Sequence, residues 1–337
     1  MNSQHDDVIA VDAVVPAEVS ELDKQQRREK IYTRAIEGHF QRLRLYTGWP
    51  LLLGYFLLPW LMYGNRQAVL FDLPARKFHI FSLTFWPQDL VLLAFILIIA
   101  AFTLFAVTAI WGRLWCGYTC PQTVWTAIFM YIEQRFEGSR SQRIKLDQES
   151  MSWKKLRRKT LKHSGWALVA GFTGITFISY FVPIRQLLPD LLSLTANTSA
   201  ASFALLFSVA TYLNAGYLRE KVCTDMCPYA RFQSVMFDKN TLVVTYDTKR
   251  GEPRGSRKRF ATKEAHQGDC VDCELCVQVC PTGIDIRAGL QYECIGCALC
   301  IDACDSIMEK MGSPKGLVSY TSENALTGNE ITGLPPK

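Results

Sequence analysis

Eight of the twelve cysteines lie near the carboxyl end and repeat one spacing. The pattern C-x2-C-x2-C-x3-C occurs first at Cys270, Cys273, Cys276 and Cys280 and again at Cys294, Cys297, Cys300 and Cys304. This spacing is typical of bacterial ferredoxins with two [4Fe–4S] clusters, in which the fourth cysteine of each run binds the other cluster. It predicts one cluster on Cys270, Cys273, Cys276 and Cys304, and a second on Cys294, Cys297, Cys300 and Cys280.

Two other uses of these cysteines fit less well. Zinc sites take their ligands as two pairs, not as triplets with an outlying fourth residue. Disulfides are disfavoured in a reducing cytoplasm. The second run departs from the ferredoxin pattern in one respect, because Asp305 and not proline follows Cys304. We expect Asp305 to loosen the turn there without removing a ligand.

The remaining four cysteines form two copies of Cys-x-x-x-Cys-Pro, CGYTCP (116–121) and CTDMCP (223–228), each after a long apolar run. Residues four apart share a helix face, so Cys116 with Cys120, and Cys223 with Cys227, could each present two sulfurs. Pro121 and Pro228 predict a local break in each helix. Thiolates suit a soft metal such as Cu(I). Met226 and Met236 could add thioether ligands, and Met130 is a weaker candidate.

Three other interpretations of this cysteine quartet stay open. Four cysteines also suffice for a third iron–sulfur cluster. A pair of thiols could cycle to a disulfide and pass on two electrons. Buried structural cysteines are the simplest alternative, since free Cys packs as a small hydrophobe. The residues alone favour copper and a third cluster about equally.

Long uncharged runs predict the elements that position these cysteines. About 20 apolar residues cross a bilayer as a helix, and four runs come close, at 46–63, 90–111, 166–184 and 199–218. The apolar stretch 124–132 is too short to span and predicts an interfacial or re-entrant helix. The fold class is therefore an α-helical membrane protein with about four transmembrane helices and a cytoplasmic α+β ferredoxin domain with two [4Fe–4S] clusters. Its predicted parts are an amino-terminal segment (1–44), a transmembrane unit (45–254), the ferredoxin domain (255–312) and a flexible tail (313–337).

The distribution of Lys and Arg predicts the orientation, because short cytoplasmic loops are rich in these residues. The segment 133–163 is strongly basic, whereas the loops 64–87 and 185–198 are poor in Lys and Arg. We therefore expect a multi-pass protein of the bacterial inner membrane with both termini, the ferredoxin domain and both Cys-x-x-x-Cys-Pro motifs on the cytoplasmic side. The net charge of +6 reflects this topology, and we expect no nucleic-acid partner. Residues 1–30 have no apolar core of a secretory signal.

Several classes of redox enzyme are excluded by missing motifs. The sequence has no C-x-x-C-H for covalent haem, no G-x-G-x-x-G after a strand and no G-x-x-x-x-G-K-[ST]. None of the five histidines lies within a predicted span. What remains is a membrane-anchored electron carrier, or a reductase with a small acceptor.

Four stretches in order resemble the CcoG/FixG/RdxA family of cytochrome c oxidase accessory proteins, which are membrane-bound polyferredoxins. They are CGYTCPQTVW (116–125), CTDMCPYARFQSVMFD (223–238), TYDTKRGEPRG (245–255) and CVDCELCVQVCPTGIDIRAGLQYECIGCALCIDACD (270–305). The resemblance covers roughly residues 30–328. The Cys-x-x-x-Cys-Pro motifs also occur in membrane ferredoxins of nitrate and nitrous-oxide respiration.

The resemblance implies a cupric-reductase-type oxidoreductase that reduces Cu(II) to Cu(I) for assembly of cbb3-type cytochrome c oxidase. Cys116, Cys120, Cys223 and Cys227 would form its copper site. The implied partners are the lipid bilayer, oxidase assembly factors or copper carriers, and an electron donor that the sequence does not identify. Family members usually continue with a further transmembrane segment and an immunoglobulin-like domain, so we expect this sequence, which stops at Lys337, to lack both.

Two rival functions need no copper reduction. In the first, the protein relays electrons from quinol to a respiratory reductase. In the second, it is a scaffold or chaperone that binds copper without redox work. The electron donor, the reduction potentials and the oligomeric state cannot be read from the sequence.

Overall fold

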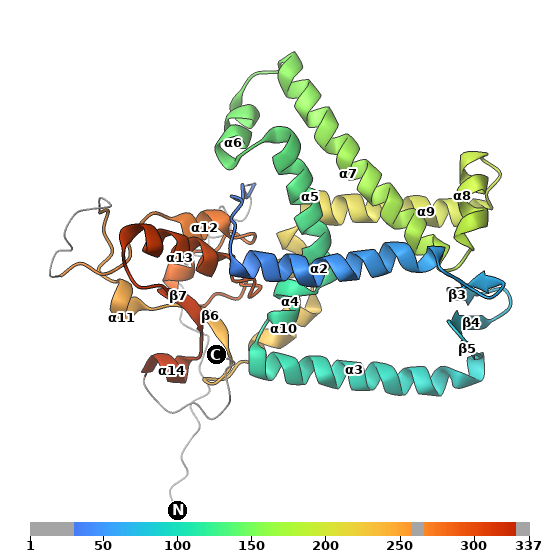
Figure 1. The fold of residues 1–337 in the computed structure, drawn as a ribbon, viewed down its shortest axis with the longest axis horizontal. Helices are drawn as coiled ribbons and strands as arrows, with labels where there is room; N and C mark the ends of the chain where they lie inside the picture. Colours follow the sequence, from blue (N-terminus) through green and yellow to red (C-terminus); the bar gives the residue numbers. More distant parts are fainter. Residues whose placement is uncertain (1–29, 258–265, 328–337) are drawn as a thin grey trace, which may run out of the picture. The chain divides into compact units, whose positions relative to one another are not determined.

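The computed structural model describes residues 30–257 and 266–327, and all features below belong to the unit that begins at Thr33. The first part of the chain is mostly helical (Figure 1). Its helices are α2 (His39–Leu57), η1 (Leu58–Trp60), η2 (Pro87–Asp89), α3 (Leu90–Trp111), α4 (Leu114–Tyr118), α5 (Pro121–Glu137), α6 (Arg140–Gln148), α7 (Trp153–Ser179), α8 (Ile184–Leu192), α9 (Thr198–Thr211), η3 (Tyr212–Leu218), η4 (Val222–Met226) and α10 (Pro228–Val235).

Two helical segments among the described residues are long and apolar enough to cross a membrane. They are Pro87–Trp111, which joins η2 to α3, and Thr198–Leu218, which joins α9 to η3. On α3 the side chains of Phe95, Ile99 and Phe102 are 60%, 64% and 71% exposed. So much exposed apolar surface on one helix is typical of a membrane span or of a protein interface. These segments coincide with two of the four predicted spans.

The other two predicted spans correspond to α2 and α7, with shifted ends. The run 46–63 was expected to be one helix, but α2 begins at His39 and ends at Leu57. Pro59 lies in η1, and the chain then enters a strand. The run 166–184 is the second half of α7, which begins at Trp153 in the basic segment and ends at Ser179. The count of four spans stays a prediction.

The residues predicted to form a short helix, 124–132, lie within the longer helix α5. It runs from Pro121 to Glu137 and packs on α7 through Phe129 and Trp166, whose indole Nε1 donates a 3.0 Å hydrogen bond to the Phe129 carbonyl. Helices α7 and α9 lie side by side at close range. A β-carbon on Gly174 would lie 2.6 Å from the Ala204 carbonyl oxygen, so only glycine allows this approach.

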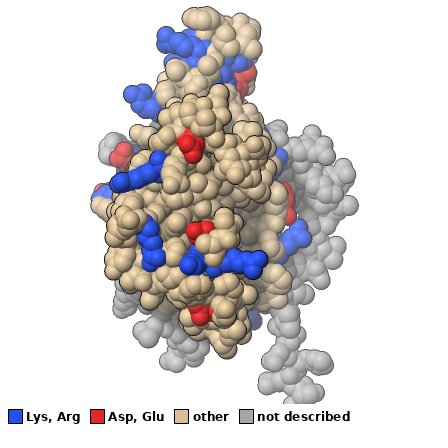
Figure 2. All heavy atoms as spheres, turned by 90° about the vertical axis from the view of Figure 1, so that its right-hand side faces the viewer, with Lys and Arg blue, Asp and Glu red and all other residues tan. Residues whose placement is uncertain are grey.

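The loop that joins α2 to α3 folds into short strands that the sequence analysis did not predict. They are β1 (Met62–Tyr63), β2 (Arg66–Gln67), β3 (Val69–Asp72), β4 (Lys77–Ile80) and β5 (Leu83–Phe85). β1 pairs with β2, and β3, β4 and β5 form an antiparallel sheet in that order. Figure 2 shows the end of the molecule with this sheet and α8 as mainly uncharged, with scattered charged side chains.

The cysteine-rich part is a small α+β unit. Its elements are β6 (Val243–Tyr246), α11 (Thr248–Gly251), α12 (Leu275–Val279), η5 (Ile286–Ala288), α13 (Leu299–Met311), β7 (Val318–Thr321) and α14 (Glu323–Thr327). β6 pairs antiparallel with β7, Val243 opposite Thr321 and Tyr246 opposite Val318. The boundaries 255 and 312 are therefore too narrow for this unit. The tail predicted as flexible instead supplies β7, whose Val318 is buried; residues 328–337 lie outside the described residues.

Asp302 connects this unit to the first helix. Its carboxylate accepts hydrogen bonds from the backbone N–H groups of Phe40 (3.1 Å) and Gln41 (2.8 Å) in the first turn of α2. Those N–H groups have no partner within the helix. A β-carbon on Gly38 would lie 2.5 Å from the Asp302 Cβ, so glycine is needed at this contact. The ferredoxin unit and α2 therefore meet through a buried cap.

Candidate metal centres

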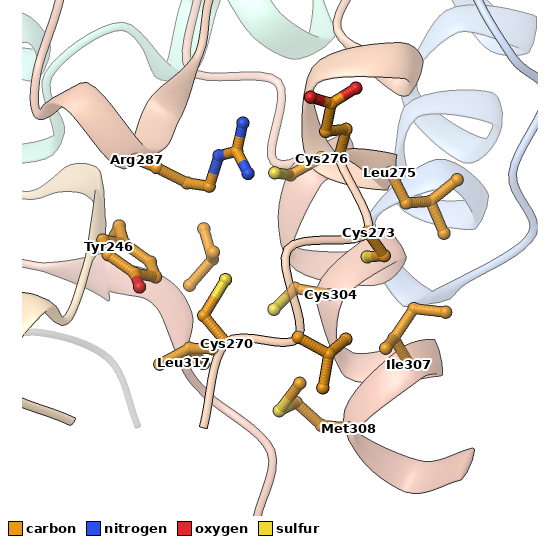
Figure 3. A pocket seen from close by; sticks show the side chains of 13 residues that line it. Tyr246, Cys270, Cys273, Leu275, Cys276, Arg287, Cys304, Ile307, Met308 and Leu317 are labelled. Carbon is orange, nitrogen blue, oxygen red and sulfur yellow. The ribbon is translucent and has the colours of Figure 1, made fainter. Parts of the chain in front are cut away.

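The first predicted ligand set surrounds one cavity. Cys270, Cys273, Cys276 and Cys304 line a space of about 370 Å³ together with Tyr246 and Arg287. Figure 3 shows the four cysteines around this space, with Leu275 and Ile307 on one side, Tyr246 and Leu317 on the other and Met308 below. The structure thus brings three cysteines of one run together with the last cysteine of the other.

The second predicted set surrounds a neighbouring cavity of about 350 Å³. Its sulfur-bearing lining consists of Cys280, Cys294, Cys297 and Cys300, together with Cys276 of the first set. Ile284, Ile286 and Ala298 complete an apolar wall. Because Cys276 lines both cavities, the two spaces adjoin, and groups bound in them would be close enough to exchange electrons.

The two cysteine loops share an unusual backbone. Asp272 and Glu274, on either side of Cys273, have φ values of 52° and 55°. Gly296 and Ala298, on either side of Cys297, have φ values of 66° and 59°. Three of the four are not glycine, and each such residue costs roughly 1–2 kcal/mol in this left-handed region. The same strained conformation at equivalent positions of both loops is typical of a functional site, where the binding of a ligand group offsets the strain.

Cys304 corrects one expectation about the second run. The missing proline at 305 was expected to loosen a turn, but Cys304 lies inside α13, which continues to Met311. A proline at Asp305 would interrupt this helix. The Asp305 carboxylate instead accepts a 2.9 Å hydrogen bond from the Gly316 N–H. Asp305 thereby fixes the chain between α13 and β7.

The donor set fits a charged inorganic cluster. Burial raises the pKa of Cys276, Cys294 and Cys304 to about 12 each. Thiols of this kind ionise only when a positive group binds the sulfur, as iron does. Within the described residues, no three His, Cys, Asp or Glu side chains lie close enough to hold one metal ion. Sulfurs spread around a cavity suit a cubane, and assignment of the eight ligands stays a prediction.

The Cys-x-x-x-Cys-Pro quartet is assembled differently from the prediction. Each cysteine pair was expected on one helix face, but each is split by a helix break. Cys116 lies in α4 and Cys223 in η4, whereas Cys120 and Cys227 are the N-caps of α5 and α10. The physical reason is proline, which favours the first turn of a helix and pushes the residue before it out of the helical region.

The two copies of the motif hold each other in place. The Cys116 thiol donates a hydrogen bond to the Gln233 side chain of α10 at 3.4 Å. In return the Gln122 amide of α5 donates to the Arg219 carbonyl, just before η4, at 3.2 Å. Burial raises the pKa of Cys116 to about 11 and that of Cys223 to about 12, and Cys120 and Cys227 add to both rises. The four cysteines therefore lie near one another, and their use as one metal site stays a prediction.

A buried ion pair supports this site from the side of the membrane helices. The Arg219 guanidinium lies 2.7 Å from the Glu133 carboxylate, and Arg143 lies 3.4 Å from the same carboxylate. The exposed fractions are 0% for Glu133 and 7% for the Arg219 side chain. Glu133 belongs to the helix that follows Cys120, and Arg219 precedes Cys223. The pair therefore joins the two halves of the quartet.

The first motif also touches the second cluster cavity directly. A β-carbon on Gly117 would lie 2.7 Å from the Gly296 carbonyl oxygen and 3.0 Å from the Cys297 Cα. Cys116 and Cys223 pack against the apolar group that contains Ile295 and Cys297. The loop between Cys116 and Cys120 thus rests on the backbone of a predicted cluster ligand.

A third cavity, of about 330 Å³, adjoins the quartet. Cys223, Met130 and Glu220 line it on one side, and Pro281, Thr282 and Ile295 line it on the side of the ferredoxin unit. Met226, the stronger candidate from the sequence, is 61% exposed. The structure therefore places Met130, and not Met226, at the cavity that reaches Cys223.

Sequence reasoning missed the residues that hold the quartet together. Gln122 and Gln233 were not singled out, although each lies within six residues of the cysteine that precedes the motif's proline. Gly117 had no signal of its own, because the need for glycine arises from the loop that packs on it. Arg143 was counted among the basic residues of 133–163 and Glu133 was not singled out, and only the fold shows that both are buried.

Comparison with protein-family models gives two matches. A 4Fe-4S dicluster domain matches residues 218–323, and a 4Fe-4S binding domain matches residues 93–137. The first match includes the eight ferredoxin cysteines and Cys223 and Cys227, and the second includes Cys116 and Cys120. The chain therefore carries 4Fe-4S binding domains. No solved structure matches it.

Three curated proteins are similar over most of this chain. The nitrogen fixation protein FixG of Rhizobium meliloti is 43% identical over 310 residues, which is 90% of this chain and 59% of that protein. Protein RdxA of Cereibacter sphaeroides is 41% identical over 298 residues, covering 87% of this chain and 62% of RdxA. Protein RdxB of the same organism is 40% identical over 299 residues, covering 87% and 63%.

The chain belongs to the FixG/RdxA family of iron–sulfur proteins. It spans 59% to 63% of the length of these relatives. The family expected from the sequence motifs is thereby confirmed.

Proposed function

We propose that this protein is a membrane-bound electron carrier that reduces Cu(II) to Cu(I) at Cys116, Cys120, Cys223 and Cys227. The observation that carries the proposal is the contact between the two kinds of centre. The loop that joins Cys116 to Cys120 rests on Gly296 and Cys297, so close that Gly117 has no room for a β-carbon. Electrons held at the second cluster cavity therefore have a short protein path to the quartet.

The chemistry divides between the two sets of cysteines. When bound, the two [4Fe–4S] clusters supply one-electron storage. Cys116, Cys120, Cys223 and Cys227 would bind Cu(II), the substrate, and each Cu(II) would take up one electron from the reduced protein to become Cu(I). A soluble reduced one-electron carrier protein of the cytoplasm restores the two electrons. Thiolates favour Cu(I) over Cu(II), so the quartet draws the reduction forward and holds its product.

The cellular role follows from the family and from the membrane helices. The resemblance supports delivery of Cu(I) for assembly of cbb3-type cytochrome c oxidase, with oxidase assembly factors or copper carriers as partners. A four-span topology in the inner membrane would place the quartet and the ferredoxin unit on the cytoplasmic side. The large excess of Lys and Arg in 133–163 over the loops 64–87 and 185–198 supports this orientation.

One observation favours a second candidate function. A 4Fe-4S binding domain matches the residues around Cys116 and Cys120, which is what a third cluster at the quartet would produce. In that case the protein relays electrons from quinol to a respiratory reductase and needs no copper. The absence of three convergent ligands for a single ion among the described residues means that copper binding has to draw the quartet sulfurs together.

Metal analysis and EPR on protein purified anaerobically separate the two functions. The wild type is compared with a variant in which Cys116, Cys120, Cys223 and Cys227 are serine. Cys276→Ser serves as the matched control, because it removes one ferredoxin ligand and leaves the quartet intact. Protein reduced with dithionite and freed of excess reductant is mixed with Cu(II), and Cu(I) is measured with a chromogenic chelator.

The copper function predicts about eight irons in both the wild type and the four-serine variant, as two [4Fe–4S] clusters require. Only the wild type then retains and reduces copper, and Cys276→Ser retains copper but loses iron. About twelve irons in the wild type and about eight in the four-serine variant would establish a third cluster instead. Copper reduction that survives in the four-serine variant would show that the site is assigned wrongly.

A further inference from the structure

Arg113 is a buried arginine between the end of α3 and the second cluster cavity. Its residue is 6% exposed. Its guanidinium donates hydrogen bonds to the carbonyl oxygens of Cys294 and Ala230, both at 2.8 Å, and to the carbonyl of Tyr292. The Tyr292 ring lies beneath it, 5.2 Å from the guanidinium carbon. The side chain therefore ties the membrane helices to a predicted cluster ligand.

Arg113 differs from the other buried arginines in the groups that surround its charge. Arg143 and Arg219 share the carboxylate of Glu133, and Arg287 pairs with Asp285. Arg113 forms no ion pair within the described part of the chain, and its Nε is buried without a hydrogen-bond partner. A buried cation without a counter-charge costs several kcal/mol. A negatively charged group other than a carboxylate of the described residues is therefore expected nearby.

The cysteine sulfurs are the groups that can supply it. Arg113 donates to the backbone of Cys294 and lies three residues before Cys116. Gly296 packs on the Arg113 backbone, where a β-carbon would lie 3.2 Å from the carbonyl oxygen. The guanidinium thus lies at the boundary between the second cavity and the quartet.

We infer that Arg113 is the counter-charge of the cluster held by Cys294, Cys297, Cys300 and Cys280, and that it raises the reduction potential of that cluster. A fixed positive charge favours the more negative, reduced cluster. Electrons would thereby be held at the cavity whose backbone lies against Gly117. The inference requires the two clusters of the proposed function but not its copper step.

The test is a redox titration followed by EPR on the purified full chain, after iron analysis. Arg113→Gln removes the charge, and Arg113→Lys keeps it without the planar fork. Arg287→Gln is the reciprocal variant, because Arg287 lines the first cavity and not the second. Copper is absent throughout, so failure of the copper function would not affect the result.

Arg113→Gln is expected to retain about eight irons and to shift one cluster about tenfold toward the oxidised form, which is ~59 mV for a one-electron couple. Arg113→Lys is expected to shift it much less, and Arg287→Gln to shift the other cluster. Unchanged potentials in an iron-replete Arg113→Gln would overturn the inference, as would equal shifts in the Gln and Lys variants. If Arg113→Gln loses iron, the Arg113→Lys variant decides between the two roles. Normal iron content and a normal potential in Arg113→Lys would support the counter-charge role. Loss of iron in Arg113→Lys as well would overturn the inference and show that Arg113 has a structural role only.

Discussion

Replacing Gly117 with alanine should separate the quartet from the second cluster cavity. The new β-carbon would lie 2.7 Å from the Gly296 carbonyl oxygen and 3.0 Å from the Cys297 Cα. Both are backbone atoms, so neither can rotate away. An extra carbon in a packed contact typically destabilises that contact by ~1–3 kcal/mol. This free energy would lower the ratio of docked to undocked conformations of the segment around Gly117 ~5 to 150-fold.

Gly171→Ala provides a matched control. Gly171 lies in α7, and a β-carbon there meets nothing within 4 Å. Both positions are helical, so alanine gains ~1 kcal/mol of helix propensity at each. The control should therefore be slightly more stable than the wild type. Only the contact with Gly296 and Cys297 distinguishes the two variants.

The assay is a single-turnover reduction of Cu(II) by pre-reduced protein, followed by stopped flow. Gly117→Ala is expected to keep its iron and its copper binding while the transfer of electrons slows within the ~5 to 150-fold range. Gly171→Ala should match the wild type. A Gly117→Ala protein that holds full iron and reduces copper at the wild-type rate would refute the proposed path.

Two further changes test the supports of the quartet and of the ferredoxin unit. Glu133→Gln removes the carboxylate shared by Arg143 and Arg219, and breaking a buried pair costs ~3–5 kcal/mol. The unfolding temperature in detergent should fall clearly and added Cu(I) should be held less tightly, whereas Lys315→Gln, at an exposed pair with Glu309, should change little. Normal copper retention in Glu133→Gln would mean that the pair does not hold the quartet. Asp302→Ala leaves the N–H groups of Phe40 and Gln41 without their cap and should lower the free energy of unfolding by ~1–3 kcal/mol, more than Asp305→Ala, which removes a single hydrogen bond to Gly316. Equal stability of the two aspartate variants would contradict the capping role.

The cysteine spacing predicted which residues lie together more completely than hydropathy predicted the ends of the helices. Ligand spacing is a local property of the chain, and both predicted sets of four line separate cavities. Of the left-handed residues beside Cys273 and Cys297, Glu274 and Ala298 have no signature in sequence, because neither residue type favours that conformation. The split of each Cys-x-x-x-Cys-Pro pair was predictable, since a residue before proline avoids the helical region. The strands at 62–85 were missed because the apolar runs on either side dominated that part of the chain.

The basic segment 133–163 shows why charge counts in sequence mix two signals. Of its basic residues, Arg143, Lys159 and Lys162 pair with Glu133 or Glu137, whose carboxylates are fully buried. These charges hold α5, α6 and α7 together and say little about which side of a membrane they occupy. The orientation argument therefore rests on the other basic residues of the segment, of which Lys154, Arg157 and Arg158 lie in the first turns of α7. Since Arg219 also pairs with Glu133, the same group of charges joins α5, which follows Cys120, to the segment that precedes Cys223.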